Sequence, residues 1–305
     1  MILAAGLTPA WQQLLVFDAL RLGEVNRASE VHWFASGKVF NVAVALRHLG
    51  ARSLALALLG GSTGVKIDED LSRLGVEHRS AWAKSPTRIC TTLIERASGV
   101  VTELVENGAP VGDEEVAAFA REYEDLARRA NVVVFSGSLP AGAPRTLYHD
   151  LMARTSCRVI LDIRGPELLD ALPLKPLVVK PNREELQRTL GRELATDGAL
   201  RDAIEETHRL GAEWVVISQG KRALWVSGGG RLHRLRPPEV PTVNPIGCGD
   251  CMAAGIGWGL DQGMDVLDAV RLGMGAAAQN AATLLTSRLD PATVRGLAAR
   301  VVEEP

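Results

Sequence analysis

The chain has 305 residues, 47% of them hydrophobic, which is enough to bury a large core in one α/β unit or in two domains. Its formal net charge of −2 gives no electrostatic reason to expect a nucleic acid or a membrane surface as partner. No apolar run approaches the roughly 20 residues of a membrane span, and four cysteines make no disulfide framework in a chain of this size. We therefore expect a cytoplasmic protein.

Short apolar runs alternate with longer helical patterns along most of the chain. After a first strand near the N-terminus, we expect strands at 54–59, 132–136, 159–163, 177–179, 214–218 and 223–226. We expect helices at 38–49, 67–74, 113–129, 144–154, 183–190, 200–210, 251–262 and 265–284. The strands are rich in Val, Ile and Leu without clean alternation. This pattern predicts a mostly parallel sheet with helices on both faces and ligands at the carboxyl ends of its strands.

Two regions, at about 11–35 and 86–106, do not fit this α/β pattern. They contain extended, partly alternating segments. In the second region, Ala97-Ser98-Gly99 separates two β-rich runs and predicts a hairpin turn. A further hairpin is expected at 228–230, where three glycines follow one another.

The strongest chemical signal lies at 244–255, which reads Asn-Pro-Ile-Gly-Cys-Gly-Asp-Cys-Met-Ala-Ala-Gly. Gly247 and Gly249 let the backbone approach a ligand, and the free N–H groups and dipole of the helix that follows favour an anion. Asp250 lies against this turn, where a carboxylate is unfavourable unless it has a task. It could take a proton from a hydroxyl while the N–H groups hold a transferred phosphoryl group. A glycine turn with an aspartate N-cap is the structural alternative.

Four motifs along the chain carry a family resemblance. Gly247-Cys248-Gly249-Asp250 resembles the C-terminal signature of the PfkB (ribokinase-like) carbohydrate kinases, and Ser36-Gly37-Lys38-Val39-Phe40-Asn41 resembles their N-terminal signature. Gly137-Ser138-Leu139-Pro140 and Lys180-Pro181-Asn182-Arg183-Glu184-Glu185 are frequent in that family, in that order. The run at 20–27 resembles the 1-phosphofructokinase and tagatose-6-phosphate kinase branch.

The resemblance covers essentially the whole chain and implies a ribokinase-like three-layer α/β fold with a small β-sheet lid. The α/β domain would comprise 1–10, 36–85 and 107–305, and the lid 11–35 and 86–106. The family's lid often supplies a dimer contact, so we expect a homodimer. The implied activity is ATP- and Mg²⁺-dependent transfer of the γ-phosphoryl group to a phosphorylated ketohexose or a related sugar.

The resemblance also assigns roles on the phosphoryl-donor side. Asp250 would be the base, and the backbone of Gly247, Cys248 and Gly249 would hold the phosphoryl group. Asn182 and Glu185 would organise Mg²⁺ through water, although the same pair predicts a helix capping box. The nucleotide would be bound by residues of these motifs and of one strand end, namely Lys180, Asn182, Ser218, Gly220, Gly247 and Gly249.

On the acceptor side, Lys38 and Arg88 are the expected readers of a phosphate, because an ammonium and a guanidinium both suit that group. A solvated surface charge is the alternative for each. The remaining acceptor-side candidates are Gln12, Gly37, Asn41, Ser138 and, more weakly, Arg27.

The acceptor side also departs from the branch pattern. Gln12 stands where an Asp normally binds sugar hydroxyls, and Cys90 and Thr92 replace an Asn and a Lys. Val105 replaces an Asn, and Pro245 removes one N–H before the glycine turn. Because polar contacts discriminate strongly between substrates, these changes predict an altered acceptor.

Three alternatives to this interpretation stay open. One is a kinase of the same fold for an unphosphorylated sugar or a nucleoside. Another is a catalytically silent regulator that binds a nucleotide or a sugar phosphate. A redox role for the pair Cys248 and Cys251 at a helix start is the third, although we interpret both as small side chains that fill the turn.

Overall fold

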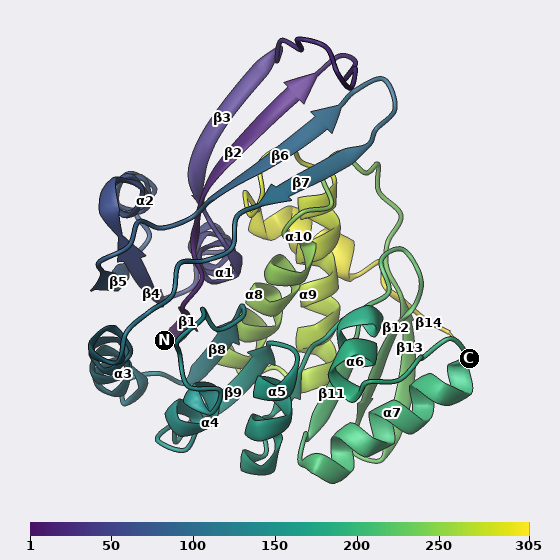
Figure 1. The fold of residues 1–305 in the computed structure, drawn as a ribbon. Coiled ribbons are helices and arrows are strands. Elements are labelled where there is room, and N and C mark those ends of the chain that lie inside the picture. Colours follow the sequence, from purple (N-terminus) through teal and green to yellow (C-terminus); the bar gives the residue numbers. More distant parts are fainter. Residues whose placement is uncertain (305) are drawn as a thin grey trace.

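The computed structural model describes residues 1–304, which form two sheets (Figure 1). The larger sheet has ten strands in the order β14-β13-β12-β11-β10-β9-β8-β1-β4-β5. Its parallel strands are β1 (Ile2–Gly6), β4 (Ser53–Gly60), β5 (His78–Ala83), β8 (Val132–Ser136), β9 (Arg158–Asp162), β10 (Val178–Val179) and β11 (Trp214–Ile217). An antiparallel edge follows, formed by β12 (Leu224–Gly228), β13 (Arg231–Arg236) and β14 (Val302–Glu304).

Helices cover both faces of this sheet, which confirms the predicted three-layer α/β class. One face carries α1 (Lys38–His48), α2 (Gly61–Arg73), α8 (Cys248–Asp261), α9 (Val266–Ala281) and α10 (Pro291–Ala298). The other carries α3 (Asp113–Ala127), α4 (Leu147–Met152), α5 (Pro166–Ala171), the short 3-10 helix η1 (Leu172–Leu174), α6 (Arg183–Leu190) and α7 (Asp197–Leu210). None of the helices in residues 1–304 is long and apolar enough to cross a membrane.

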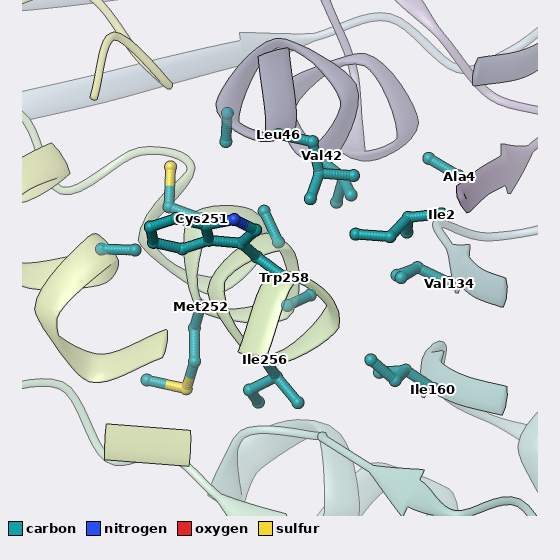
Figure 2. Packing of buried hydrophobic residues seen from close by; sticks show 14 of the residues in the cluster. Ile2, Ala4, Val42, Leu46, Val134, Ile160, Cys251, Met252, Ile256 and Trp258 are labelled. Atoms are coloured by element: carbon teal, nitrogen blue, oxygen red, sulfur yellow. The ribbon is translucent and has the colours of Figure 1, made fainter. Parts of the chain in front are cut away.

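Alternation along the central strands builds the two cores. In β1, Ile2 and Ala4 belong to one buried cluster, whereas Leu3 and Ala5 belong to the other, because successive side chains of a strand point to opposite faces. Figure 2 shows the first cluster, in which Ile2 and Ala4, with Val134 and Ile160, face side chains of α1 and α8. The labelled helix residues are Val42, Leu46, Cys251, Met252, Ile256 and Trp258.

Glycines bring α8 and α9 unusually close together. A Cβ added to Gly255 would lie 2.6 Å from the Cα of Gly273, and one added to Gly259 would lie 2.9 Å from the Cα of Ala269. Only a residue without a side chain allows this approach. The contact fixes α8, and therefore its N-terminus, against the rest of the domain.

The second sheet stands above the first as a lid (Figure 1). Its order is β3-β2-β6-β7, formed by β2 (Ala10–Phe17), β3 (Glu30–Ser36), β6 (Ile89–Glu95) and β7 (Val101–Val105). Strands β2 and β6 pair in parallel and the other two pairs are antiparallel. Its own small core consists of Leu14, Val16, Phe34 and Ile94, packed against Leu284 and Leu285.

Most predicted elements are present, and the differences have local causes. Helix α8 begins at Cys248 rather than at Cys251, because Gly247, with a φ of 80°, forms its N-cap. Residues 248–250 therefore form the first turn of the helix. Helix α2 begins at Gly61 and not at 67, although its first turn is rich in Gly, Ser and Thr. Edge strands β5 and β14 and helices α5 and α10 were not predicted, since they are short or carry polar residues on one face.

Candidate active site

A cavity of about 420 Å³ opens between the lid and the carboxyl ends of the central strands. Most of the predicted site residues line it, namely Gln12, Gly37, Lys38, Asn41, Arg88, Lys180, Asn182, Glu185, Ser218, Gly220, Gly247, Cys248, Gly249 and Asp250. Two predicted residues, Ser138 and Arg27, are exposed and do not line it. A larger hollow of about 820 Å³ lies around Asn131 and Cys157, at the opposite end of the strands, and contains none of the predicted residues.

Asp250 is buried at the floor of this cavity, in the first turn of α8. Asn41, on α1, donates a hydrogen bond from Nδ2 to its Oδ2 at 2.7 Å. Burial and the nearby negative charge of Asp162 raise the pKa of Asp250 to about 6. A carboxylate with a pKa so close to neutrality is suited to accept a proton from a hydroxyl and to release it again.

Residues 247–250 form the turn that ends with Asp250, and we call this segment the anion turn. Gly247 adopts a left-handed backbone, and an added Cβ would lie 2.1 Å from Cγ2 of Thr286, so no other residue fits. The N–H groups of Gly249 and Asp250 donate to no backbone carbonyl within residues 1–304. Two free donors at the positive end of a helix form a site for an anion.

Asn280, a fully buried residue of α9, supports the anion turn through contacts of its side chain. Its Nδ2 donates to the carbonyl of Ile246 at 2.8 Å and contacts Sγ of Cys248 at 3.4 Å. Its Oδ1 accepts from the N–H of Ser287 at 2.7 Å and from the thiol of Cys251 at 3.3 Å. This residue was not predicted from the sequence, because a single Asn near the end of an apolar helix carries no motif.

Cys248 in the anion turn and Cys251, the residue that follows the turn, lie in an environment that disfavours thiolates. Burial raises the pKa of Cys248, and it raises the pKa of Cys251 still more strongly. Reactive cysteines have a lowered pKa instead. This environment supports the interpretation that both side chains fill space around the turn.

Two lysines and two carboxylates form a cluster beside the anion turn. Nζ of Lys180 lies 3.0 Å from Oδ1 of Asp162, and Nζ of Lys38 lies 3.6 Å from the same atom and 3.5 Å from Oε1 of Glu185. Burial raises the pKa of Asp162, but the charges of Lys180 and Lys38 outweigh it and hold that pKa below its usual value. Desolvation opposes the charge of Lys38, yet Asp162 and Glu185 outweigh it and raise its pKa. Lys38 therefore stays cationic next to Asp250.

Asp162 was missed by the sequence analysis, although a signal was present. It is the last residue of β9, and side chains at the carboxyl ends of parallel strands are where ligands bind in open α/β sheets. The run Val-Ile-Leu-Asp at 159–162, an apolar strand that ends in a carboxylate, marks such a position.

Asn182 and Glu185 form the capping box of α6. Asn182 accepts the N–H of Glu185 through Oδ1 at 2.8 Å, and Glu185 accepts the N–H of Asn182 through Oε2 at 3.0 Å. The other carboxylate oxygen of Glu185 faces Lys38 across the cavity. The structural role of this pair therefore also aims one carboxylate oxygen at the site, and the two interpretations are compatible.

Arg88 lines the cavity, but its guanidinium is engaged by the backbone. It donates to the carbonyls of Thr8 at 3.1 Å, Pro9 at 3.3 Å and Glu106 at 3.1 Å. These bonds attach the lid strand β6 to the segments that lead into and out of the lid. A solvated surface charge, the alternative considered from the sequence, does not describe this residue.

Comparisons with known proteins agree with this geometry. The model of the pfkB family carbohydrate kinases matches residues 12–292, and the chain therefore belongs to that family. Phosphofructokinase-2 from Escherichia coli in complex with fructose-6-phosphate is 26% identical, with a TM-score of 0.85 over 98% of this chain and 99% of that one. A possible 1-phosphofructokinase from Thermotoga maritima shares the fold at 22% identity, with a TM-score of 0.91 over 99% of this chain and 98% of that one.

Ribokinase from Arabidopsis thaliana, complexed with ribose and ATP, has the same fold at 18% identity. Its TM-score is 0.76 over 97% of this chain and 98% of that one. The family, together with the likeness to phosphofructokinase-2, supports the general activity predicted from the sequence. The chain is an ATP-dependent sugar kinase.

Proposed function

We propose that this kinase transfers the γ-phosphoryl group of MgATP to a hydroxyl of a phosphorylated ketohexose or a closely related sugar. The observation that carries the proposal is the position of Asp250. A buried carboxylate with a pKa of about 6 lies beside free N–H groups at a helix N-terminus, with the side chains of Lys38 and Lys180 nearby. This arrangement provides a base for the acceptor hydroxyl and a site for the charge that develops on the phosphoryl group.

In the proposed reaction, Asp250 takes the proton of the acceptor hydroxyl as that oxygen attacks the γ-phosphorus. The bond between phosphorus and the β–γ bridging oxygen of ATP breaks, and ADP leaves with the electron pair. The anion turn donates hydrogen bonds to the phosphoryl oxygens, while Lys38 and Lys180 balance their charge. Asn41 keeps the carboxylate of Asp250 oriented through its 2.7 Å hydrogen bond.

The residues around Lys38 also fit a divalent cation carried by ATP. Mg²⁺ prefers oxygen ligands and usually keeps several waters. Glu185 directs one carboxylate oxygen into the cavity, and the backbone N–H of Asn182 holds its other carboxylate oxygen in the capping box. Bound there through water, Mg²⁺ would neutralise the phosphate oxygens of ATP.

Phosphofructokinase-2, which has been observed with fructose-6-phosphate, supports a phosphorylated acceptor, and so do two cations on the cavity wall. One observation favours the second candidate, an unphosphorylated sugar. Lys38 and Arg88 are both engaged by groups of the protein itself. Each would have to give up some of these contacts in order to bind an acceptor phosphate. Arg88→Met separates the candidates through a ratio, because the loss of its bonds to the lid affects every acceptor. If Arg88 binds a phosphate, the KM of the phosphorylated sugar should rise about tenfold more than the KM of the matching free sugar.

We further propose that the lid forms a homodimer contact. Its outer face carries Trp11 and Trp33, stacked at 5.9 Å between ring centroids. Trp33, Val31 and Leu104 on the same face are 40%, 53% and 55% exposed. A second copy of the chain would cover this apolar surface. Sedimentation of Trp33→Lys should then give a monomer where the wild type gives a dimer, and an unchanged mass would contradict the proposal.

The test of the proposed function is ADP release from MgATP against a panel of acceptors. The panel contains fructose 6-phosphate, fructose 1-phosphate, tagatose 6-phosphate, free hexoses and nucleosides, and Asp250→Asn is assayed beside the wild type. Turnover of a sugar phosphate that the variant loses supports the proposal. Turnover of a neutral sugar alone would favour the second candidate. ATP binding without any turnover would favour a silent regulator.

A further inference from the structure

Two of the residues that depart from the branch pattern touch each other. Gln12 on β2 donates from Nε2 to Oγ1 of Thr92 on β6 at 3.0 Å. Both are almost fully buried, with exposed fractions of 5% and 2%. Gln12 also lines the cavity above Asp250, whereas Thr92 lies behind it. The pair is part of the inner face of the lid.

The surroundings of Gln12 fix which way its amide points. Its Nε2 lies 3.1 Å from the backbone carbonyl of Gln13, and a carbonyl can only accept, so the atom that faces it must be the NH₂ group. The second N–H is used by Thr92. Both donors of the amide are therefore engaged, and only Oε1 is left.

Oε1 of Gln12 accepts no hydrogen bond from the protein, yet it is not enclosed. The only fully enclosed side-chain N or O atoms without a partner in residues 1–304 are Oγ of Ser80 and Nε of Arg234. Since Gln12 is one of the residues that line the cavity, the place where Oε1 is accessible is the cavity itself. The structure thus presents one oriented, uncharged acceptor to whatever binds there.

We infer that Thr92 is a positioning residue, which holds Gln12 as a pure acceptor for one hydroxyl of the sugar. The inference rests on the proposed function. It explains together why both Gln12 and Thr92 depart from the branch pattern. A carboxamide whose donors are engaged offers a hydroxyl the same lone pairs as a carboxylate, but without charge. The cavity is already lined by Asp162, Glu185 and Asp250, and also by Glu103, so a further carboxylate would be repelled.

A set of four variants tests this inference, with fructose 6-phosphate as acceptor, or whichever acceptor of the panel is turned over. Thr92→Val keeps the shape and removes the oxygen that Gln12 binds. We expect the KM for the acceptor to rise about tenfold, with kcat and the KM for ATP little changed, because a freely rotating amide still permits the reaction. Thr92→Ser keeps the hydroxyl and should behave as the wild type. In a Gln12→Ala background, Thr92→Val should add nothing, since it acts through Gln12.

Thr91 provides a matched control on the next position of β6. Its Oγ1 donates to Oε1 of Gln13 at 3.3 Å, so it forms the same kind of pair on the opposite face of the lid. Thr91→Val should leave the acceptor KM unchanged. Equal effects of the Thr91 and Thr92 variants, or effects of Gln12 and Thr92 that simply add, would overturn the inference. Failure of the wild type to turn over any acceptor would instead overturn the proposed function.

Discussion

The donor side and the acceptor side of the cavity are built in different ways. Donor-side groups are held by contacts within the central domain, such as the capping box of α6, the glycine N-cap of α8 and the ion pairs of Asp162. The acceptor side consists of a thin sheet whose polar residues bond to one another and to backbone carbonyls. Under the proposed function, the core fixes the phosphoryl-transfer chemistry, whereas a few pairs in the lid set the choice of acceptor.

Gly247→Ala should disturb the geometry of the donor side most strongly. The new Cβ would clash with Thr286 and strain a left-handed backbone, so the anion turn must move. We expect kcat to fall by about 10²–10³, the cost of losing one such donor. Gly263→Ala, at the other end of α8, is the matched control, because Gly263 also has a positive φ but open space around it. Similar kcat values for the two variants would contradict the assigned role of the turn.

Asn280→Ala should have a smaller effect on rate and a clear one on stability. It leaves the N–H of Ser287 without a partner and the carbonyl of Ile246 with only a 3.4 Å bond from Oγ1 of Thr286, and a buried unpaired group costs about 1–3 kcal/mol. We expect the free energy of unfolding to fall by about 2–4 kcal/mol, and kcat to fall by about tenfold as the turn loosens. Asn131→Ala removes a bond to Asp261 at the far end of α8 and should leave kcat unchanged. A wild-type kcat in Asn280→Ala would show that the turn does not need this support.

Asp250→Asn should stabilise the protein at neutral pH, and this change in the free energy of unfolding is the smallest of the three expected effects. The pKa of Asp250 is raised to about 6, so ionisation favours the unfolded chain, and wild-type stability is lost as pH rises from about 4 through 6. The variant avoids that loss and should be more stable by about 1–3 kcal/mol near pH 8, with the difference vanishing near pH 4. Urea denaturation at both pH values measures it. A difference that does not change with pH would mean that this carboxyl is not perturbed.

The donor-side candidates, which line one cavity in the structure, could be found from the sequence because they lie in contiguous motifs at helix starts and strand ends. The capping box at Asn182 and the turn at Gly247 depend on neighbours within a few residues, so local pattern suffices. Asp162 was missed although it ends a strand, and Asn280 was missed because its partners are 34 and 7 residues away.

Less of the acceptor side could be seen from the sequence, because its contacts join distant segments. Arg88 was expected to read a phosphate, and the sequence did not show that its guanidinium also bonds carbonyls up to 80 residues away. Ser138 and Arg27 were expected in the site and lie outside its lining. Gln12 and Thr92 were seen as two separate departures, since only the parallel pairing of β2 with β6 brings them together.

The role of Asp250 as the base is tested most directly by the pH dependence of kcat/KM. With the best acceptor of the panel, the wild type should lose activity on the acid side with an apparent pKa near 6. Asp250→Asn should lose about 10²–10⁴ in kcat and show no such acid limb. A flat wild-type profile across this range, with the variant within a few-fold of it, would show that Asp250 is not the base.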